Sequence, residues 1–366
     1  VQGVAAGLAN PYYARMATSA TASVMGDVMA QSPTFFSLWI GANDVLGYAT
    51  SGGTGEDHNM TGNLDAATYA GNDITHAGVF AQVYGGLLQT LTSGGAEGIV
   101  ANLPNVADAP FFTTVPHAPL DPTNPDFAPQ IPALNAQFGQ LNQVFAALGV
   151  PERSIEFSTT AASAVVIKDE SLTDLSAQIT GALMAGGADA GTATILGLLY
   201  GQARQATADD LILLTASGAI ATVDTDNVAY LMGLGLDQAT AGQLSVTGLT
   251  LPMGDGMVLI PDEQTAISNA ITAYNQTISN AATTFDLAFF DVNAFFTEVA
   301  TNGYQAGSAF MTADLVTGGT FSLDGIHPSP RGNAVIANQM INAINAKYGS
   351  NLPTVNPVDY TGVYLD

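Results

Sequence analysis

The stretch TFFSLWIGAND, residues 34–44, is the part of the sequence that decides the fold class. Residues 34–40 are a short, nearly continuous apolar run, which is typical of a strand buried on both faces of a parallel sheet. The run stops at Gly41, where Gly-Ala-Asn-Asp is a turn signal. The stretches GIVANL (98–103) and LAFFDV (287–292) predict two further buried strands.

Helical patterns alternate with these strands. The last one is the best defined: Ser329 can cap it, Pro330 suits its first position and Gly349 can end it. Strands that alternate with helices predict an α/β fold, a three-layer α/β/α arrangement around a mostly parallel sheet. The expected helices cover residues 15–31, 73–93, 132–148, 262–283 and 330–346.

The 366 residues, of which 47% are apolar, are enough for a large core. We expect one domain, 1–366, with an insertion or cap at about 151–260. Inside it, IEFSTT and SAVVIKD predict short strands, and helical pieces are expected around 174–185, 191–204 and 227–234. Residues 50–72 read as a surface loop. Residues 104–132 hold eight of the 17 prolines, with Phe111, Phe112 and Phe127 as apolar anchors; this segment is either a packed connection or one wall of a substrate cleft.

The charge balance excludes several partners. The sequence has 31 acidic and 6 scattered basic residues, a formal net charge of -25. No basic stripe exists to neutralise phosphates, so nucleic-acid binding is excluded, and anionic membranes would repel the chain. With no cysteine there is no disulfide or thiol chemistry. No apolar run is long enough to span a bilayer. The composition, rich in Asn, Thr and Gly and poor in Lys, favours a secreted bacterial protein or one of the cell envelope, at the outer surface or in the periplasm.

Two places carry chemistry. Asn43 follows a buried strand, where open α/β sheets place their sites, and its amide could donate to a developing oxyanion. The alternative is a turn in which Asn43 or Asp44 bonds its own backbone. Asp324 and His327, in LDGIHP before the last helix, could form a hydrogen-bonded pair in which the carboxylate orients an imidazole base. The alternative is a capped loop with an incidental histidine.

Together and in this order, WIGAND and LDGIHP resemble the third and fifth conserved blocks of the GDSL, or SGNH, esterases and lipases. IVANLPNVADAPFF (99–112), IPDEQTAISNAITAYNQTI (260–278) and LAFFDVNAFF (287–296) extend the resemblance, which covers about 15–150 and 255–348. It implies a flavodoxin-like SGNH-hydrolase fold. It also implies that Asn43 is an oxyanion donor in a turn that Gly41 allows, that His327 is the base and then the acid, and that Asp324 orients it.

The nucleophile of that family, the serine of a Gly-Asp-Ser block on the first strand, has no counterpart here. Gly26-Asp27-Val28 and Gly254-Asp255-Gly256 have the wrong third residue. Gly3 and Gly7 are poor stand-ins for the glycine of the second block. We therefore expect the first strand of the sheet to be missing from this chain. The serine should lie upstream of Val1, on a separate, cleaved or otherwise absent N-terminal fragment of the same protein.

The leading hypothesis is a carboxylic-ester hydrolase, a lipase or esterase, that uses no cofactor and no metal. Its substrate is an ester, lipid-like if the apolar cap forms a lid over an acyl chain. A catalytically inactive SGNH-like binding or surface protein is the alternative. Metal-dependent hydrolysis is a third hypothesis. Glu56-Asp57-His58 and Asp224-Thr225-Asp226 contain side chains of the types that bind metals, but neither has the spacing of a known metal site. His58, His76 and His117 are interpreted as structural or solvent-exposed, and His117, in the proline-rich segment, is the only one of them that we would test as a substrate contact.

Overall fold

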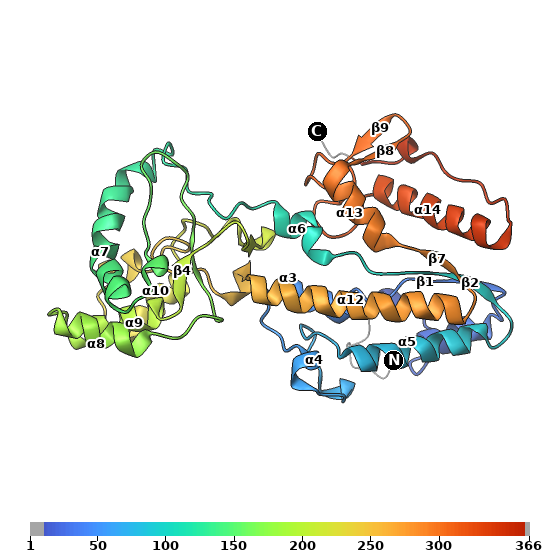
Figure 1. Cartoon of the computed structure of the whole chain (residues 1–366), viewed down its shortest axis with the longest axis horizontal. Helices are drawn as coiled ribbons and strands as arrows, with labels where there is room; N and C mark the ends of the chain where they lie inside the picture. Colours follow the sequence, from blue (N-terminus) through green and yellow to red (C-terminus); the bar gives the residue numbers. More distant parts are fainter. Residues whose placement is uncertain (1–10, 363–366) are drawn as a thin grey trace.

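The central element of the computed structural model, which describes residues 11–362, is a three-stranded sheet. Its order is β1-β2-β7 and both pairings are parallel. The register places Phe36 opposite Gly98, and Val100 opposite Phe289. The strands are β1 (Phe35–Leu38), β2 (Glu97–Ala101) and β7 (Ala288–Phe290). The sheet lies in the right-hand part of Figure 1, and all three predicted strands are present. Gly3 and Gly7 lie outside the described residues.

Helices cover both faces of this sheet. Successive side chains of β2 point to opposite faces, so each face has apolar side chains for helices to pack against. Val100 packs into an apolar cluster that includes side chains of three helices on one face, whereas Ile99 and Ala101 pack into another that includes side chains of two helices on the other face. The prediction of an α/β fold with a parallel sheet is confirmed. The first group is α3 (Asn43–Thr50), α5 (Ala77–Thr92) and α12 (Pro261–Thr284), and the second is α13 (Val292–Asn302) and α14 (Pro330–Tyr348).

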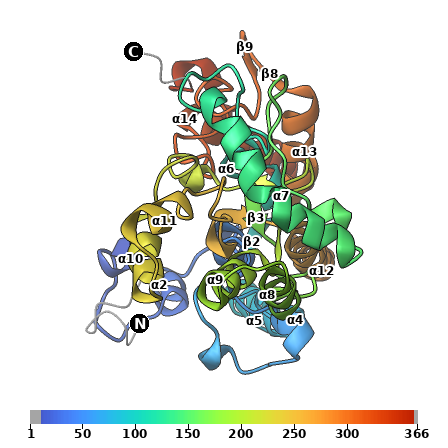
Figure 2. The ribbon, with the colours of Figure 1, turned by 90° about the vertical axis from the view of Figure 1, so that its left-hand side faces the viewer.

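A second lobe with its own apolar core lies to the left of the sheet in Figure 1 and faces the viewer in Figure 2. Its core runs from Leu120 to Ile260, so it begins upstream of residue 151, where the insertion was expected. α6 (Pro110–Thr113) lies between the lobe and the sheet. The other elements are α7 (Ile131–Ala147), β3 (Val166–Lys168), α8 (Ser176–Ala185), α9 (Ala190–Tyr200), β4 (Ala203–Gln205), β5 (Leu211–Ile212), α10 (Thr225–Gly233), α11 (Gln238–Gln243) and β6 (Val258–Leu259).

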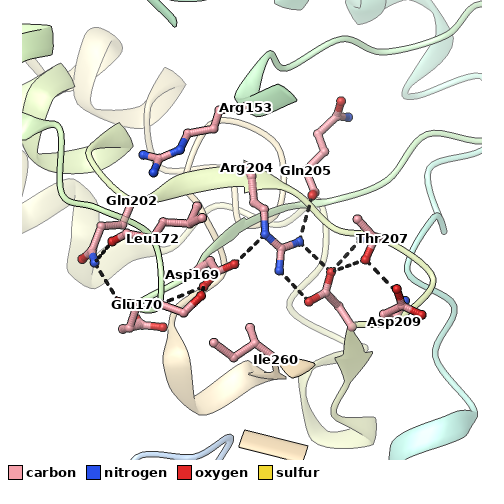
Figure 3. Close-up of polar contacts among 12 residues, drawn as sticks. Arg153, Asp169, Glu170, Leu172, Gln202, Arg204, Gln205, Thr207, Asp209 and Ile260 are labelled. Atoms are coloured by element: carbon pink, nitrogen blue, oxygen red, sulfur yellow. Dashed lines mark hydrogen bonds and ion pairs between the residues drawn. The ribbon is translucent and has the colours of Figure 1, made fainter. Parts of the chain in front are cut away.

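A buried ion network holds the strands of this lobe together (Figure 3). Arg204, on β4, donates through Nε to Asp169 Oδ2 at 2.6 Å. Its Nη1 and Nη2 donate to the two carboxylate oxygens of Asp210 at 2.6 and 2.8 Å. Burial works to lower the pKa of Arg204, but these bonds outweigh it and raise that pKa above its ordinary value. Such a bidentate fork fixes geometry as well as charge.

The structure differs from the sequence prediction where polar side chains take over backbone hydrogen bonds. The prediction of one helix over 15–31 is wrong: α1 (Pro11–Ala14) is separate and α2 (Val24–Ala30) begins after Ser23, whose hydroxyl accepts from Gly26 N. The Ser- and Thr-rich segment before Ser23 is a turn, as such residues favour. The predicted loop over 50–72 contains a short helix, α4 (His58–Thr61).

IEFSTT, predicted as a strand, has no strand partner. The amides of Asn142 and Asn135, on α7, instead bond the backbones of Ile155 and Phe157 at 2.9 Å in both directions. A short antiparallel hairpin, β8 (Tyr304–Ala306) and β9 (Ala309–Met311), follows α13 and was not predicted. Within residues 11–362, no helix has the length and apolar character needed to cross a membrane.

Candidate functional site

Asp324 and His327 form a hydrogen-bonded pair on the loop that precedes α14. His327 Nδ1 lies 2.7 Å from Asp324 Oδ2. The other carboxylate oxygen accepts from the Ser322 hydroxyl at 2.7 Å and from the backbone N–H groups of Ile326 and His327 at 2.9 Å. The loop is thus wound around the carboxylate, which receives four hydrogen bonds. The contact predicted between Asp324 and His327 is present.

These bonds set the charge of the carboxylate. Partial burial works to raise the pKa of Asp324, but the hydrogen bonds from Ser322, Ile326 and His327 outweigh it and hold that pKa well below its ordinary value. Asp324 is therefore ionised throughout the neutral range. A carboxylate at Nδ1 favours the tautomer with a proton on that nitrogen and leaves Nε2 as the proton acceptor. The His327 side chain is 74% exposed, so its ring is open to a reacting group.

The loop is held against α6 by its backbone. Gly325 O accepts from Phe111 N at 3.0 Å, and Ser322 N donates to His327 O at 2.7 Å. Gly325 has a φ of +72°, and a Cβ there would lie 2.8 Å from Phe111 N. A side chain at this position would therefore be strained and would push the loop away from α6. Phe111 was predicted as an apolar anchor; its side chain is buried in an apolar cluster, and its backbone N–H also holds the loop of Asp324 and His327.

Asn43 lies just beyond the end of β1. It is the first residue of α3 and is exposed, so the predicted turn is very short. The turn depends on Gly41, whose φ is +115° and whose added Cβ would lie 2.8 Å from the Phe80 ring. Asn43 follows the carboxyl end of a parallel strand, the place where open α/β sheets bind ligands.

The structure brings Asn43 and His327 together as walls of one cavity of about 380 Å³. Asp324 does not line it and bonds the His327 ring instead. Trp39 and Phe296 also line this cavity; both belong to motifs recognised in the sequence, which gave no sign that they form a wall, and the role of Phe112 was left open there. Phe112 is a cavity wall, whereas Phe127 packs into the core of the second lobe.

No serine among the described residues is bonded to His327 Nε2. Ser322 takes part in the hydrogen bonds around the pair, but its hydroxyl donates to the Asp324 carboxylate. The Gly26-Asp27-Val28 segment lies in α2, where the Asp27 carboxylate accepts from the Thr18 hydroxyl at 2.5 Å. That segment therefore has a structural role. Among the described residues, the site therefore holds a carboxylate–imidazole pair and an amide side chain, and no serine hydroxyl is bonded to the His327 ring.

The other histidines have structural partners. His58 is buried, with Nε2 2.9 Å from Asp73 Oδ2 and its ring stacked on Tyr69. His76 caps α5 by accepting from Gly78 N at 2.9 Å. His117 does not line the cavity that His327 lines, and its carbonyl accepts from Val165 N.

The acidic segments considered as metal ligands cap helices. The Asp57 carboxylate accepts from Asn59 N at 2.9 Å, and the Asp224 carboxylate accepts from the N–H groups of Asp226 and Asn227. Over residues 11–362, no group of three or more His, Asp or Glu side chains is placed to hold a metal ion. The geometry gives no support to a metal-dependent reaction at these two segments.

Comparisons with protein-family models, with curated proteins and with solved structures found no match to this chain.

Proposed function

We propose that this chain carries the acid–base pair and an oxyanion donor of a serine-type carboxylic-ester hydrolase of the SGNH kind. The observation that supports this most is the Asp324–His327 pair at 2.7 Å, with the imidazole at an apolar cavity that Asn43 also lines. An ionised carboxylate, a base oriented by it and an amide donor are three of the four parts that such chemistry needs.

In this reaction a serine hydroxyl attacks the ester carbonyl and gives its proton to His327 Nε2. Asn43 donates to the oxyanion that forms. The leaving alcohol takes the proton from His327 as the C–O bond breaks, which leaves an acyl-enzyme. Water then attacks this ester, again with His327 as base, and releases the acid and the free serine. Asp324 keeps its negative charge throughout and stabilises the imidazolium.

The serine is proposed to come from a segment that is not among the described residues, an N-terminal fragment of the same protein or a separate chain. The same proposal includes a flavodoxin-like three-layer fold, a cap formed by residues 151–260, and export from a bacterial cell. The lack of a serine at His327 among residues 11–362 favours one alternative, a catalytically inactive binding or surface protein.

Ester hydrolysis by the complete natural protein, with and without His327→Ala, tests the proposal. Loss of a general base costs roughly 10²–10⁴-fold in rate, so kcat/KM should fall by that factor. His117→Ala is the matched control, since it removes a histidine outside the cavity, and should keep full activity. Equal turnover by the His327→Ala variant and the unsubstituted protein would eliminate the assignment.

A fluorophosphonate probe separates the enzyme from the inactive alternative. An activated serine should be labelled, and the labelled peptide identifies where it lies. No labelling and no turnover by the complete protein would favour the inactive alternative.

A further inference from the structure

The cavity beside His327 is apolar along most of its wall. Its volume of about 380 Å³ falls in the lower part of the range of small-molecule sites. Trp39, Phe112 and Phe296 come from three segments far apart in the sequence and line it together. The Phe296 ring packs against Phe321, with centroids 5.5 Å apart, so part of this wall is fixed by aromatic contacts. Such a wall suits an unbranched alkyl chain.

The described part of the cavity wall has few ionisable side chains, and an acidic one is not balanced by a Lys or Arg. Among the described residues that line the cavity, Asp108 is the one carboxyl group, and none is Lys or Arg. The Asn105 amide donates to Asp108 Oδ1 at 2.9 Å, which fixes the position of the carboxyl group. Burial raises the pKa of Asp108, and the bond from Asn105 opposes that rise. A ligand carboxylate would find no Lys or Arg side chain among the described residues of this wall and one acidic neighbour, Asp108.

We propose that this cavity binds the alkyl chain of an uncharged ester and that Asp108 is a specificity-determining residue that disfavours carboxylates. The inference rests on the proposed function. It adds a consequence: hydrolysis turns a neutral ligand into an anion, and repulsion from Asp108 favours release of that product. The formal net charge of -25 acts in the same direction at longer range.

Trp39 gives a direct readout, because it is the single tryptophan of the sequence and lines the cavity. Its fluorescence can be titrated with unbranched methyl ketones of increasing length, which carry a carbonyl group but cannot be hydrolysed. The affinity should rise roughly fourfold with each added methylene until the cavity is full. Carboxylates with the same number of carbons should bind at least about tenfold more weakly.

Asp108→Asn isolates the charge, because asparagine keeps an oxygen that can accept from Asn105. This variant should bind carboxylates roughly fivefold or more tightly than the unsubstituted chain and bind ketones equally well. Asp262→Asn is the matched control: it removes an exposed charge in the first turn of α12, outside the cavity, and should change neither affinity.

Ala300→Phe tests the apolar wall, since Ala300 lines the cavity from α13 and is exposed enough for a larger side chain. It should shorten the longest ketone that still gains affinity. Ala294→Phe, on the same helix but outside the cavity, should leave the series unchanged.

The proposal is overturned if the ketone affinity does not depend on chain length, or if Asp108→Asn leaves the preference for ketones over carboxylates unchanged. Neither measurement needs the serine. A chain that binds as expected but never hydrolyses esters would refute the proposed function alone, and an active esterase without these preferences would refute this inference alone.

Discussion

Two regions of this molecule use carboxylates in opposite ways. In the second lobe, Asp210 is fully buried and Asp169 is 5% exposed, and both are bonded to Arg204. At the end of the parallel sheet, Asp324 is 50% exposed and is bonded to His327. Each pair has short bonds, yet the first is closed to solvent and the second is open to it.

The difference in burial separates stability from chemistry. A buried and fully bonded ion pair cannot lose its partner without leaving an uncompensated charge in the interior, so it holds its lobe together. An exposed pair is screened by water and stabilises the fold little. In exchange, its imidazole can accept a proton from a reacting group and return it. Substitutions in the two regions should therefore change different quantities.

Arg204→Ala should give the largest effect on stability. It leaves Asp169 and Asp210 buried without their partner, so the free energy of unfolding should fall by about 3–5 kcal/mol. Urea unfolding followed by circular dichroism measures it. Lys168→Ala is the matched control, because the Lys168–Glu170 pair is 48% and 33% exposed and should contribute less than about 1 kcal/mol.

At a temperature where Arg204→Ala is still folded, kcat/KM of the complete protein should be unchanged. A variant that keeps its stability but loses ester hydrolysis would break the comparison, since it would tie the buried network to the site.

Asn43→Ala should have the reverse profile. In the proposed mechanism Asn43 is an oxyanion donor, and loss of one such donor costs about 3–4 kcal/mol of transition-state stabilisation, so kcat should fall roughly 10²–10³-fold with little change in KM. The midpoint of thermal unfolding should stay the same, because the Asn43 side chain is exposed. Asn280→Ala, an exposed asparagine on α12, is the control. A rise in KM without a fall in kcat would contradict the role proposed for Asn43.

The sequence predicted the strands of the sheet and the pair at its edge because these signals are local. A buried strand followed by Gly41 and Asn43, and an Asp-x-x-His before a capped helix, can be recognised within a few residues. The contact between His327 and Asp324 needs only one tight loop. The position of Asn43 in the site could be predicted because open α/β sheets bind ligands at the carboxyl ends of their parallel strands.

The cavity wall and the buried network could not be predicted in this way. Trp39, Phe112 and Phe296 come from segments whose packing depends on how α6 and α13 sit on the sheet, and no periodicity records that. Arg204 appeared as one of a few scattered cations, and only the pairing of β3 with β4 brings it to Asp169. IEFSTT failed as a strand because Asn135 and Asn142, distant in the sequence, satisfy its backbone.

The junction of the two regions should depend on pH. Glu263, in the first turn of α12, accepts from the N–H of Ile260, which belongs to the core of the second lobe. Burial is the main cause that raises the pKa of Glu263 to about 8, and Asp255 and Glu170 add to it, while the bond from Ile260 opposes it. Lys168 is the cation that acts on Asp255.

The direction of this pH dependence follows from the raised pKa of Glu263. In the unfolded chain Glu263 titrates near its ordinary 4.5, so between 4.5 and about 8 the folded protein holds a proton that the unfolded chain has lost. This stabilisation is complete below that window and is lost as the pH rises through it. The unfolding midpoint should therefore fall as the pH rises from about 5 to about 9.

Glu263→Gln should flatten this fall, because glutamine stays neutral and its side-chain oxygen can still accept from Ile260. Glu298→Gln, an exposed glutamate on α13, removes the same charge and should leave the pH dependence as it is. A Glu263→Gln variant with the full pH dependence of unfolding would show that the junction is held by its apolar contacts, and that the two regions do not share a titrating group.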